Sequence, residues 1–396
     1  MKAATLRAAA MGAAAGFVTA YATVRAAQAF GDLRAPYPPF AQRNPLQYGR
    51  ARRKLAVAGL ARGIGSAATF AFFVADPLER ALRPLPRALR VPAFALAALT
   101  LDTLRDAGVA YVEDLVLERV YGMSHQSARE WAIDQAKATA IAALVTVVLT
   151  VLADAAITRA PRRWPWLAIA STPVLLALAT VIAPTFVMPL FNRYEPLTGE
   201  LEERIRALAA RYGVGDAAIL RFDMSRQTAK ANAFVTGVLG TERIALADTL
   251  IDTFSADEIL FVVAHELGHY VRRDTWRGIA VATVAVALMI LGADALLRRT
   301  TGRDVDSAAQ GARLAFYAQL VTLVLGPLTN AVSREIERRA DRFAVAATND
   351  AGAGVRAFRR LGEQNLAEFD PPRWAELLFA SHPSLASRIR VLEASA

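Results

Sequence analysis

Two histidines lie four residues apart in the stretch AHELGHYVRRD, residues 264–274, and a glutamate directly follows the first of them. Positions four apart lie above one another on one face of a helix, so His265 and His269 can offer two imidazole nitrogens to one metal ion. Glu266 lies beside that face, where it could take a proton from a water molecule. The order H-E-x-x-H is typical of zinc metalloproteases, and neutral imidazole is a ligand that suits zinc.

A capping signal predicts where the helix that carries these histidines begins. The run from Ser255 to Glu258 has the pattern S-x-x-E, in which the two side chains bind free backbone N–H groups at a helix N-terminus. The sequence therefore predicts a helix from about residue 256 through AHELGHY. The alternative is a helix with two satisfied core histidines, which the complete motif makes less favourable.

A zinc site of this kind needs a third protein ligand, often a glutamate, and the chain has no cysteine that could serve. The stretch NAVSREIERRADRFA, residues 330–344, continues an apolar helix and offers Glu337 and Asp341 on one face. Glu337 would bind the metal, and Asp341 would accept a hydrogen bond from a ligand imidazole. Glu335 competes for the ligand position, although with Arg339 it could simply form an exposed ion pair.

The composition indicates a membrane protein. Hydrophobic residues make up 55% of the 396 residues, and the mean hydropathy is +0.29. The net charge of +10 comes largely from arginines that flank apolar runs, which favours anchoring among membrane lipids and gives no support for a nucleic-acid partner. Seven stretches approach the roughly 20 apolar residues that a spanning helix needs: about residues 4–24, 55–75, 91–116, 138–158, 166–188, 278–297 and 312–332.

Two of these stretches allow a second interpretation. Residues 4–24 have a basic start and an apolar run like a signal peptide, although a retained helix is favoured. Residues 91–116 carry Asp102, Arg105, Asp106, Glu113 and Asp114. Charged groups at membrane depth usually face a bundle interior or a water-filled cavity. Either this helix lines such a cavity, or it leaves the membrane near residue 102.

Beyond the histidine motif, several blocks are similar to the type I CAAX prenyl proteases, which are integral membrane zinc endopeptidases. AHELGHY resembles the zinc helix of that family, and SREIERRAD resembles its S-R-x-x-E-x-x-A-D block. KANAFVTGVLGTERIALADTLI is similar to the strand that precedes the zinc helix, and SHPSLASRI to a C-terminal motif. YGMSHQSAREWAIDQAK and IAPTFVMPLFNRYEPL resemble the N-terminal membrane region, so the likeness extends over nearly the whole chain.

The resemblance implies an all-α-dominated polytopic membrane protein, with about seven transmembrane helices around a water-filled chamber and a zincin-like zinc-peptidase domain carrying a small β-sheet. Residues 1–190 would form the N-terminal membrane region with about five helices. Residues 191–396 would form the peptidase domain, including two further membrane helices near 278–297 and 312–332. The composition, rich in alanine and arginine, suggests a bacterial member.

The resemblance also implies residue roles. It places the third ligand at Glu337 rather than Glu335, and it implies that His382 and Arg388 face the active site, where they would steady an oxyanion or peptide carbonyls. His125 has no counterpart and is interpreted as structural. The strand ANAFVTG would present an open edge for substrate, with Asn232 and Ala233 as substrate-binding residues, unless it is an interior strand.

These observations predict a membrane zinc endopeptidase with one Zn²⁺ per chain and Glu266 as general base. Its substrate would be a peptide or membrane protein, with or without a lipid modification. Two other classes remain open, namely an intramembrane-cleaving metalloprotease and a catalytically idle membrane scaffold. Arginines load the first two loops alike, so charge alone does not fix the orientation. The resemblance favours a bacterial inner membrane, with the zinc domain towards the cytoplasm.

Overall fold

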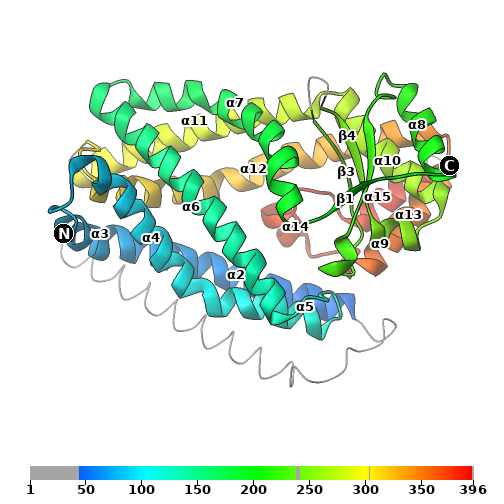
Figure 1. Ribbon diagram of the computed structural model, residues 1–396, viewed down its shortest axis with the longest axis horizontal. Helices are drawn as coiled ribbons and strands as arrows, with labels where there is room; N and C mark the ends of the chain where they lie inside the picture. Colours follow the sequence, from blue (N-terminus) through cyan, green and yellow to red (C-terminus); the bar gives the residue numbers. More distant parts are fainter. Residues whose placement is uncertain (1–43, 238–240, 303, 395–396) are drawn as a thin grey trace.

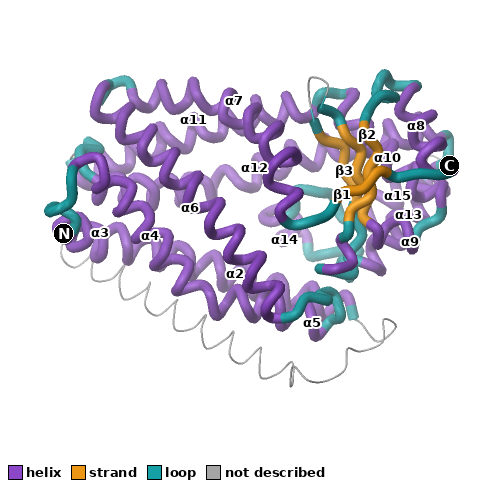
Figure 2. Tube along the Cα trace, in the orientation of Figure 1, coloured by secondary structure: helices purple, strands orange, loops and turns teal. Residues whose placement is uncertain are grey.

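The computed structural model describes residues 44–237, 241–302 and 304–394, so the expected first membrane segment at 4–24 lies outside the described residues. Long helices fill one end of the molecule, and a small sheet with shorter helices fills the other (Figure 1; Figure 2). Two long helices, α11 and α12, run from the helical end towards the sheet and join the two regions.

The N-terminal region is entirely helical in the described residues apart from short connections. Its elements are α2 (Pro45–Thr69), a π-turn (Phe70–Val74), α3 (Ala75–Ala81), α4 (Arg87–Ala110), a π-turn (Tyr111–Val116), α5 (Leu117–Val120), α6 (Ala128–Arg159), α7 (Trp164–Ile182), a π-turn (Ala183–Val187) and a 3₁₀ turn (Met188–Leu190). The C-terminal region contains β1 (Tyr194–Pro196), α8 (Glu200–Ala210), β2 (Ala218–Phe222), a 3₁₀ turn (Met224–Arg226), β3 (Ala233–Thr236), β4 (Arg243–Ala247), α9 (Asp248–Thr253), α10 (Ala256–Val271), α11 (Asp274–Thr301), α12 (Ala308–Thr348), α13 (Ala351–Gln364), α14 (Arg373–Phe379) and α15 (Leu385–Glu393).

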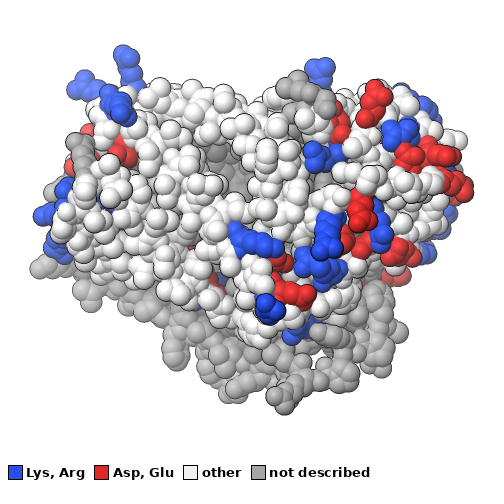
Figure 3. Space-filling model, in the orientation of Figure 1, with Lys and Arg blue, Asp and Glu red and all other residues white. Residues whose placement is uncertain are grey.

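Within the described residues, five helical runs are long and apolar enough to cross a membrane. They are Pro45–Ala81, Ala128–Arg159, Trp164–Leu190, Asp274–Thr301 and Ala308–Thr348, and they contain five of the seven predicted segments. In the view of Figure 3, charged side chains gather over the sheet and at the far tips of the helices, while the helical flank between them is nearly free of charge. The chain is therefore an integral membrane protein.

The predicted segment 91–116 forms a helix, α4, but it is not among the five runs, so the expected count of seven is not reached in the part of the chain that the structure describes. The charged residues of this segment make it too polar to count as a membrane-spanning run. Arg105 contacts Asp102 at 2.5 Å and Asp106 at 2.7 Å, and Arg62 of α2 reaches Asp106 at 3.1 Å.

These charges border a cavity among the membrane helices. The cavity has a volume of about 1750 Å³ and is lined by side chains of α2, α4, α6 and α12, among them Arg62, Asp102 and Arg105. The first of the two interpretations of segment 91–116, in which its charges line a cavity, therefore matches the structure for these residues.

The sheet has four strands in the order β1-β2-β4-β3. β2 and β4 are parallel, whereas β1 pairs with β2 and β3 pairs with β4 in antiparallel fashion. β4 supplies the buried centre, because Ile244, Ala245, Leu246 and Ala247 are all buried. Within the described residues β3 lies at the edge of the sheet, as expected for ANAFVTG, and not in its interior.

α10 begins where the capping signal predicts. The Ser255 N–H donates to Glu258 Oε2 at 2.8 Å, and the Glu258 N–H donates to Ser255 Oγ at 3.4 Å. The helix is buried along most of its length, with Phe261 and Leu267 fully buried in the main hydrophobic core. This packing holds the histidine-bearing turns in place, since little of the helix is free to move in solvent.

α12 is continuous from the membrane into the C-terminal region, as the sequence predicts, and it packs against α10. Gly268 of α10 makes close packing possible: a Cβ atom on this residue would lie 3.0 Å from Phe343 Cδ1 of α12. The small residue lets the two helices approach, and Glu337 of α12 thereby reaches the histidines of α10.

Candidate metal centre

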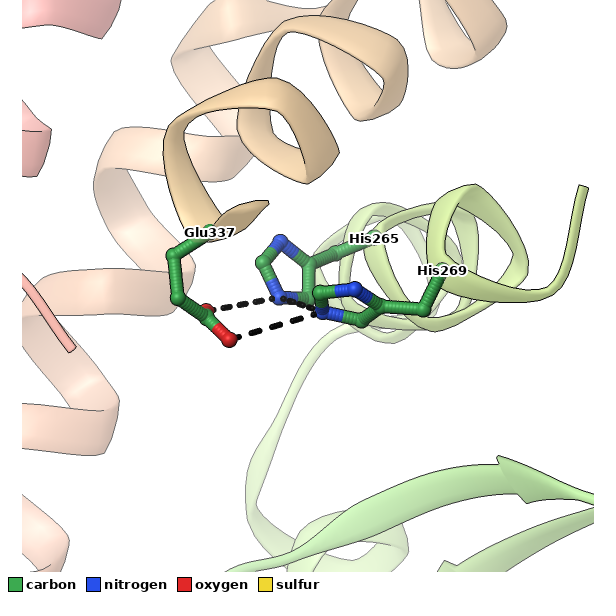
Figure 4. A group of neighbouring side chains, drawn as sticks. All are labelled: His265, His269 and Glu337. Carbon is green, nitrogen blue, oxygen red and sulfur yellow. Dashed lines mark hydrogen bonds and ion pairs between the residues drawn. The ribbon is translucent and has the colours of Figure 1, made fainter. Parts of the chain in front are cut away.

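His265, His269 and Glu337 converge on one point, as Figure 4 shows. His265 Nε2 lies 3.3 Å from Glu337 Oε2, and His269 Nε2 lies 3.6 Å from Glu337 Oε1. The two Nε2 atoms are 3.2 Å apart. One donor atom from each residue lies within 4.8 Å of the others, so the three could ligate a single ion.

The donor set fits a metal ion on chemical grounds. Glu337 Oε2 is buried, and its nearest partners are the nitrogens His265 Nε2 at 3.3 Å and Arg388 Nη2 at 3.9 Å. A buried carboxylate is costly unless positive charge compensates it, so the site favours a cation. Burial lowers the pKa of His265, but contacts with Asp341 and Glu337 outweigh this and raise it to about 9, so a metal ion must displace a proton from this imidazole. Two imidazoles and a carboxylate without thiolate are a ligand set that zinc accepts.

A carboxylate holds the outer nitrogen of each histidine. His265 Nδ1 lies 2.9 Å from Asp341 Oδ1, which is the contact that the spacing of Glu337 and Asp341 predicts. His269 Nδ1 lies 3.1 Å from Asp274 Oδ2. Each contact fixes the tautomer with Nδ1–H outward, which leaves both Nε2 lone pairs directed at the centre.

Asp274 is a site residue that the sequence reasoning missed, although it closes the quoted stretch AHELGHYVRRD. On a continuous helix a residue five positions after His269 lies on a different face. The chain instead breaks after α10: Arg273 adopts a left-handed conformation, φ 57°, and Asp274 begins α11. This turn brings the carboxylate back to His269, and the charged residues after the second histidine were the only signal of it.

Arg388 lies beside Asp341, and its Nη2 also lies 3.3 Å from His265 Nδ1 and 3.9 Å from Glu337 Oε2. Its Nη2 donates to Asp341 Oδ1 at 2.6 Å and its Nε donates to Oδ2 at 2.9 Å, while the guanidinium lies 4.0 Å from the ring centre of Phe358. Only 10% of the side chain is exposed. A bidentate ion pair with Asp341 occupies one edge of the guanidinium. The contact of Arg388 with an oxyanion or a peptide carbonyl stays a prediction.

His382 lies on the open side. Its Nε2 is 3.3 Å from Glu337 Oε1, and 61% of its side chain is exposed. Glu266 is partly buried, and burial raises the pKa of its carboxyl group. The charges of His265, His269 and Glu337 also act on the pKa of Glu266, which directly follows His265 on α10.

The other predicted site residues, Glu335, Asn232 and Ala233, lie apart from the three converging side chains. Glu335 is exposed and contacts Arg338, Arg339 and Arg342, so it takes the exposed ion-pair role. Asn232 is exposed at the start of β3, and its carbonyl oxygen accepts the Ala247 N–H at 2.9 Å. Ala233 opens the edge strand, and both residues lie where a strand could be added.

Asp274→Asn is expected to weaken metal affinity by about 10–100-fold, because the asparagine side chain offers His269 Nδ1–H a neutral acceptor in place of a charged one. Asp341→Asn should have the same effect at His265. Metal competition with a chromogenic chelator measures the effect. Arg277→Gln is the matched control, since Arg277 contacts Asp274 at 3.0 Å but not the imidazole. Equal affinities for Asp274→Asn and wild type would show that the contact has no role in metal binding.

Fold and site together define a membrane-bound metallopeptidase. The chain belongs to peptidase family M48: the profile of that family matches residues 195–396. A second profile, described as CAAX prenyl protease N-terminal with five membrane helices, matches residues 48–193.

Individual relatives agree with this assignment. The protein YhfN of Bacillus subtilis, described as an uncharacterized metalloprotease, is 32% identical over 286 residues, which cover 69% of this chain and 66% of that protein. CAAX prenyl protease 1 of Saccharomyces cerevisiae is 28% identical over 317 residues, which cover 74% of this chain and 70% of the yeast protein. The chain thus spans about two thirds of the length of these relatives.

A solved structure has the same fold. The crystal structure of S. mikatae Ste24p superposes with a TM-score of 0.76 over 98% of both chains, at 24% sequence identity. The similarity confirms the helix-rich architecture with a small mixed sheet.

Proposed function

We propose that this protein is a zinc endopeptidase that hydrolyses peptide bonds, with one Zn²⁺ held by His265, His269 and Glu337. The observation that carries the proposal is the convergence of these three side chains, whose donor atoms lie within 4.8 Å of one another. When bound, zinc would supply a Lewis acid that polarises a carbonyl group and lowers the pKa of water.

The side chains around the centre have distinct tasks in this proposal. Glu266 acts as general base: it takes a proton from water and passes it to the leaving amine. Its raised pKa, caused by burial, brings it closer to the working pH than that of an ordinary glutamate. His382, exposed on the open side, donates a hydrogen bond to the developing oxyanion or to a peptide carbonyl. Asp341, Asp274 and Arg388 position the imidazoles.

The edge of β3 supports the proposed mode of substrate binding. An extended peptide can add to an exposed sheet edge through main-chain hydrogen bonds. Asn232 and Ala233 lie at the start of this edge and would contact the peptide. The substrate is therefore an extended segment of a peptide or membrane protein, and a lipid on that segment is compatible with the cavity among the membrane helices.

Two observations weigh against the other classes. α10 is not among the helices suited to spanning a membrane, whereas an intramembrane-cleaving enzyme would embed its zinc helix. A scaffold would not need Glu266, because this residue is not among the converging donors. We further propose that the site faces the cytoplasm of a bacterial cell and that residues 191–396 act as the peptidase domain.

The proposal is tested on protein purified in detergent. One zinc per chain should be found, and a mixture of farnesylated and unmodified peptides should be cleaved by the zinc-loaded protein only. Removing zinc with a chelator should abolish cleavage, and adding one equivalent should restore it. Carefully handled protein that holds no zinc would overturn the metal assignment, and zinc-loaded protein that cleaves neither peptide set would overturn the enzymatic one.

A further inference from the structure

Hydrogen bonds to distant residues hold the segment that leads into β3. The Ala229 N–H donates to the Met123 carbonyl at 3.0 Å, and the Ala229 carbonyl accepts from Gln364 Nε2 at 3.0 Å. The Lys230 carbonyl accepts from Thr249 Oγ1 at 2.7 Å. Chain segments from three different regions thus fix this short stretch before the edge strand begins.

Asn365 makes two further hydrogen bonds, both to Ala231. Its Oδ1 accepts the Ala231 N–H at 2.8 Å, and its Nδ2 donates to the Ala231 carbonyl at 3.3 Å. A residue of a neighbouring antiparallel strand makes the same pair of bonds when it lies directly opposite. The side-chain amide of Asn365 therefore takes the place of a strand residue opposite Ala231.

The register of β3 shows which other residues face the same way as Ala231. The Asn232 carbonyl accepts the Ala247 N–H, so the backbone groups of Asn232 point towards β4. Backbone direction alternates along an antiparallel edge strand, so Ala231, Ala233 and Val235 point away from β4. Within the described ranges no strand pairs with that side of β3. The outward groups of Ala231 are covered by Asn365, and those of Ala233 and Val235 remain available.

The loop that carries Asn365 is held in a strained shape. The next residue, Leu366, has a left-handed conformation, φ 49°, which costs a non-glycine residue roughly 1–2 kcal/mol. Its side chain is buried in a cluster with Tyr48, Leu117 and Met123 of the N-terminal region. Packing against this region therefore maintains the turn and fixes the position of the Asn365 amide.

We propose that Asn365 ends the hydrogen-bonding edge available to substrate, so that an extended peptide pairs with Ala233 and Val235 and with no residue before them. The inference rests on the proposed function, because it assumes that substrate adds to β3. Asn365 is a positioning residue: it ends the paired part of the substrate at Ala233. A longer peptide must leave the sheet at Ala233.

Peptide length is the variable that tests this inference. Peptides are lengthened one residue at a time at either end, and their binding to zinc-loaded Glu266→Gln protein is measured by fluorescence anisotropy, which needs no turnover. With Asn365 present, lengthening the peptide at the end beside Ala231 should not raise affinity once Ala233 is paired. In Asn365→Ala, two further residues at one end should add roughly tenfold in affinity, from about two new main-chain hydrogen bonds to Ala231.

Two control variants and a second measurement test whether the effect on peptide length comes from the cover of Ala231 by Asn365. Gln364→Ala removes the adjacent amide but leaves Ala231 covered, so it should keep the wild-type length limit. Asn365→Asp retains the acceptor for the Ala231 N–H and should show a smaller gain. Residue-resolved hydrogen exchange should find the Ala231 amide protected in the free protein and, in Asn365→Ala, protected only when the longer peptide is bound.

The outcomes separate this inference from the proposed activity. A length limit that is the same in Asn365→Ala, while the Ala231 amide exchanges freely, overturns the role of Asn365 whether or not the protein cleaves peptides. A limit that shifts as expected supports it, even if protein with intact Glu266 cleaves nothing. Peptides whose binding leaves the Ala233 and Val235 amides unprotected overturn it as well.

Discussion

Replacing Glu266 with glutamine is expected to slow peptide cleavage by roughly 10²–10⁴-fold while zinc stays bound. Glutamine keeps the shape of the side chain but cannot accept a proton from water. The metal should remain because the three converging donor atoms belong to His265, His269 and Glu337. Zinc content and the cleavage rate of one synthetic peptide are measured on the same detergent preparation.

His382→Ala is the companion variant to Glu266→Gln. It should retain zinc too, and it should lower the rate by about 10²–10³-fold if the imidazole acts as an oxyanion donor. The smaller loss would distinguish a hydrogen-bond donor from the general base. Cleavage at the wild-type rate by zinc-loaded Glu266→Gln would rule out the mechanism proposed for Glu266.

The second large effect concerns the metal itself. Glu337→Gln and His265→Ala should each lose zinc almost completely under conditions where wild type holds one equivalent. The loss of affinity should exceed the roughly 100-fold upper limit expected for a residue that only hydrogen-bonds a metal ligand. Each change removes one of three protein ligands, and Glu337→Gln also removes the negative charge that the buried site offers a cation. Metal analysis after gel filtration in detergent reports the loss.

Glu335→Gln is the matched control for the metal ligand. Glu335 lies on the same helix two residues before Glu337, yet it is exposed and paired with arginines. Its replacement should leave zinc binding unchanged, and exposed ion pairs of this kind contribute little to stability. Zinc loss in Glu335→Gln but not in Glu337→Gln would show that the registration of α12 on the centre is wrong.

The local part of the centre could be read from the sequence because short-range geometry determines it. The helix that carries His265, Glu266 and His269 begins at the Ser255 capping box, and a spacing of four places both imidazoles on one face. The same rule places Glu337 and Asp341 together on α12, although only the resemblance to a known family chose Glu337 over Glu335. The five apolar runs follow from composition, since a spanning helix must be apolar over its length.

Tertiary structure alone decided the contacts that depend on chain reversals and on packing between distant segments. Asp274 reaches His269 because Arg273 turns the chain, and Arg388 faces Asp341 because α15 packs beside α12. Asn365 meets Ala231 across 134 positions of sequence, which no periodicity can indicate. The sequence by itself therefore determined which side chains can bind metal and accept a proton. The sequence also predicted that Asp341 orients one imidazole, whereas only the fold decided that Asp274 orients the other and where the substrate edge ends, because those positions depend on the relative placement of elements.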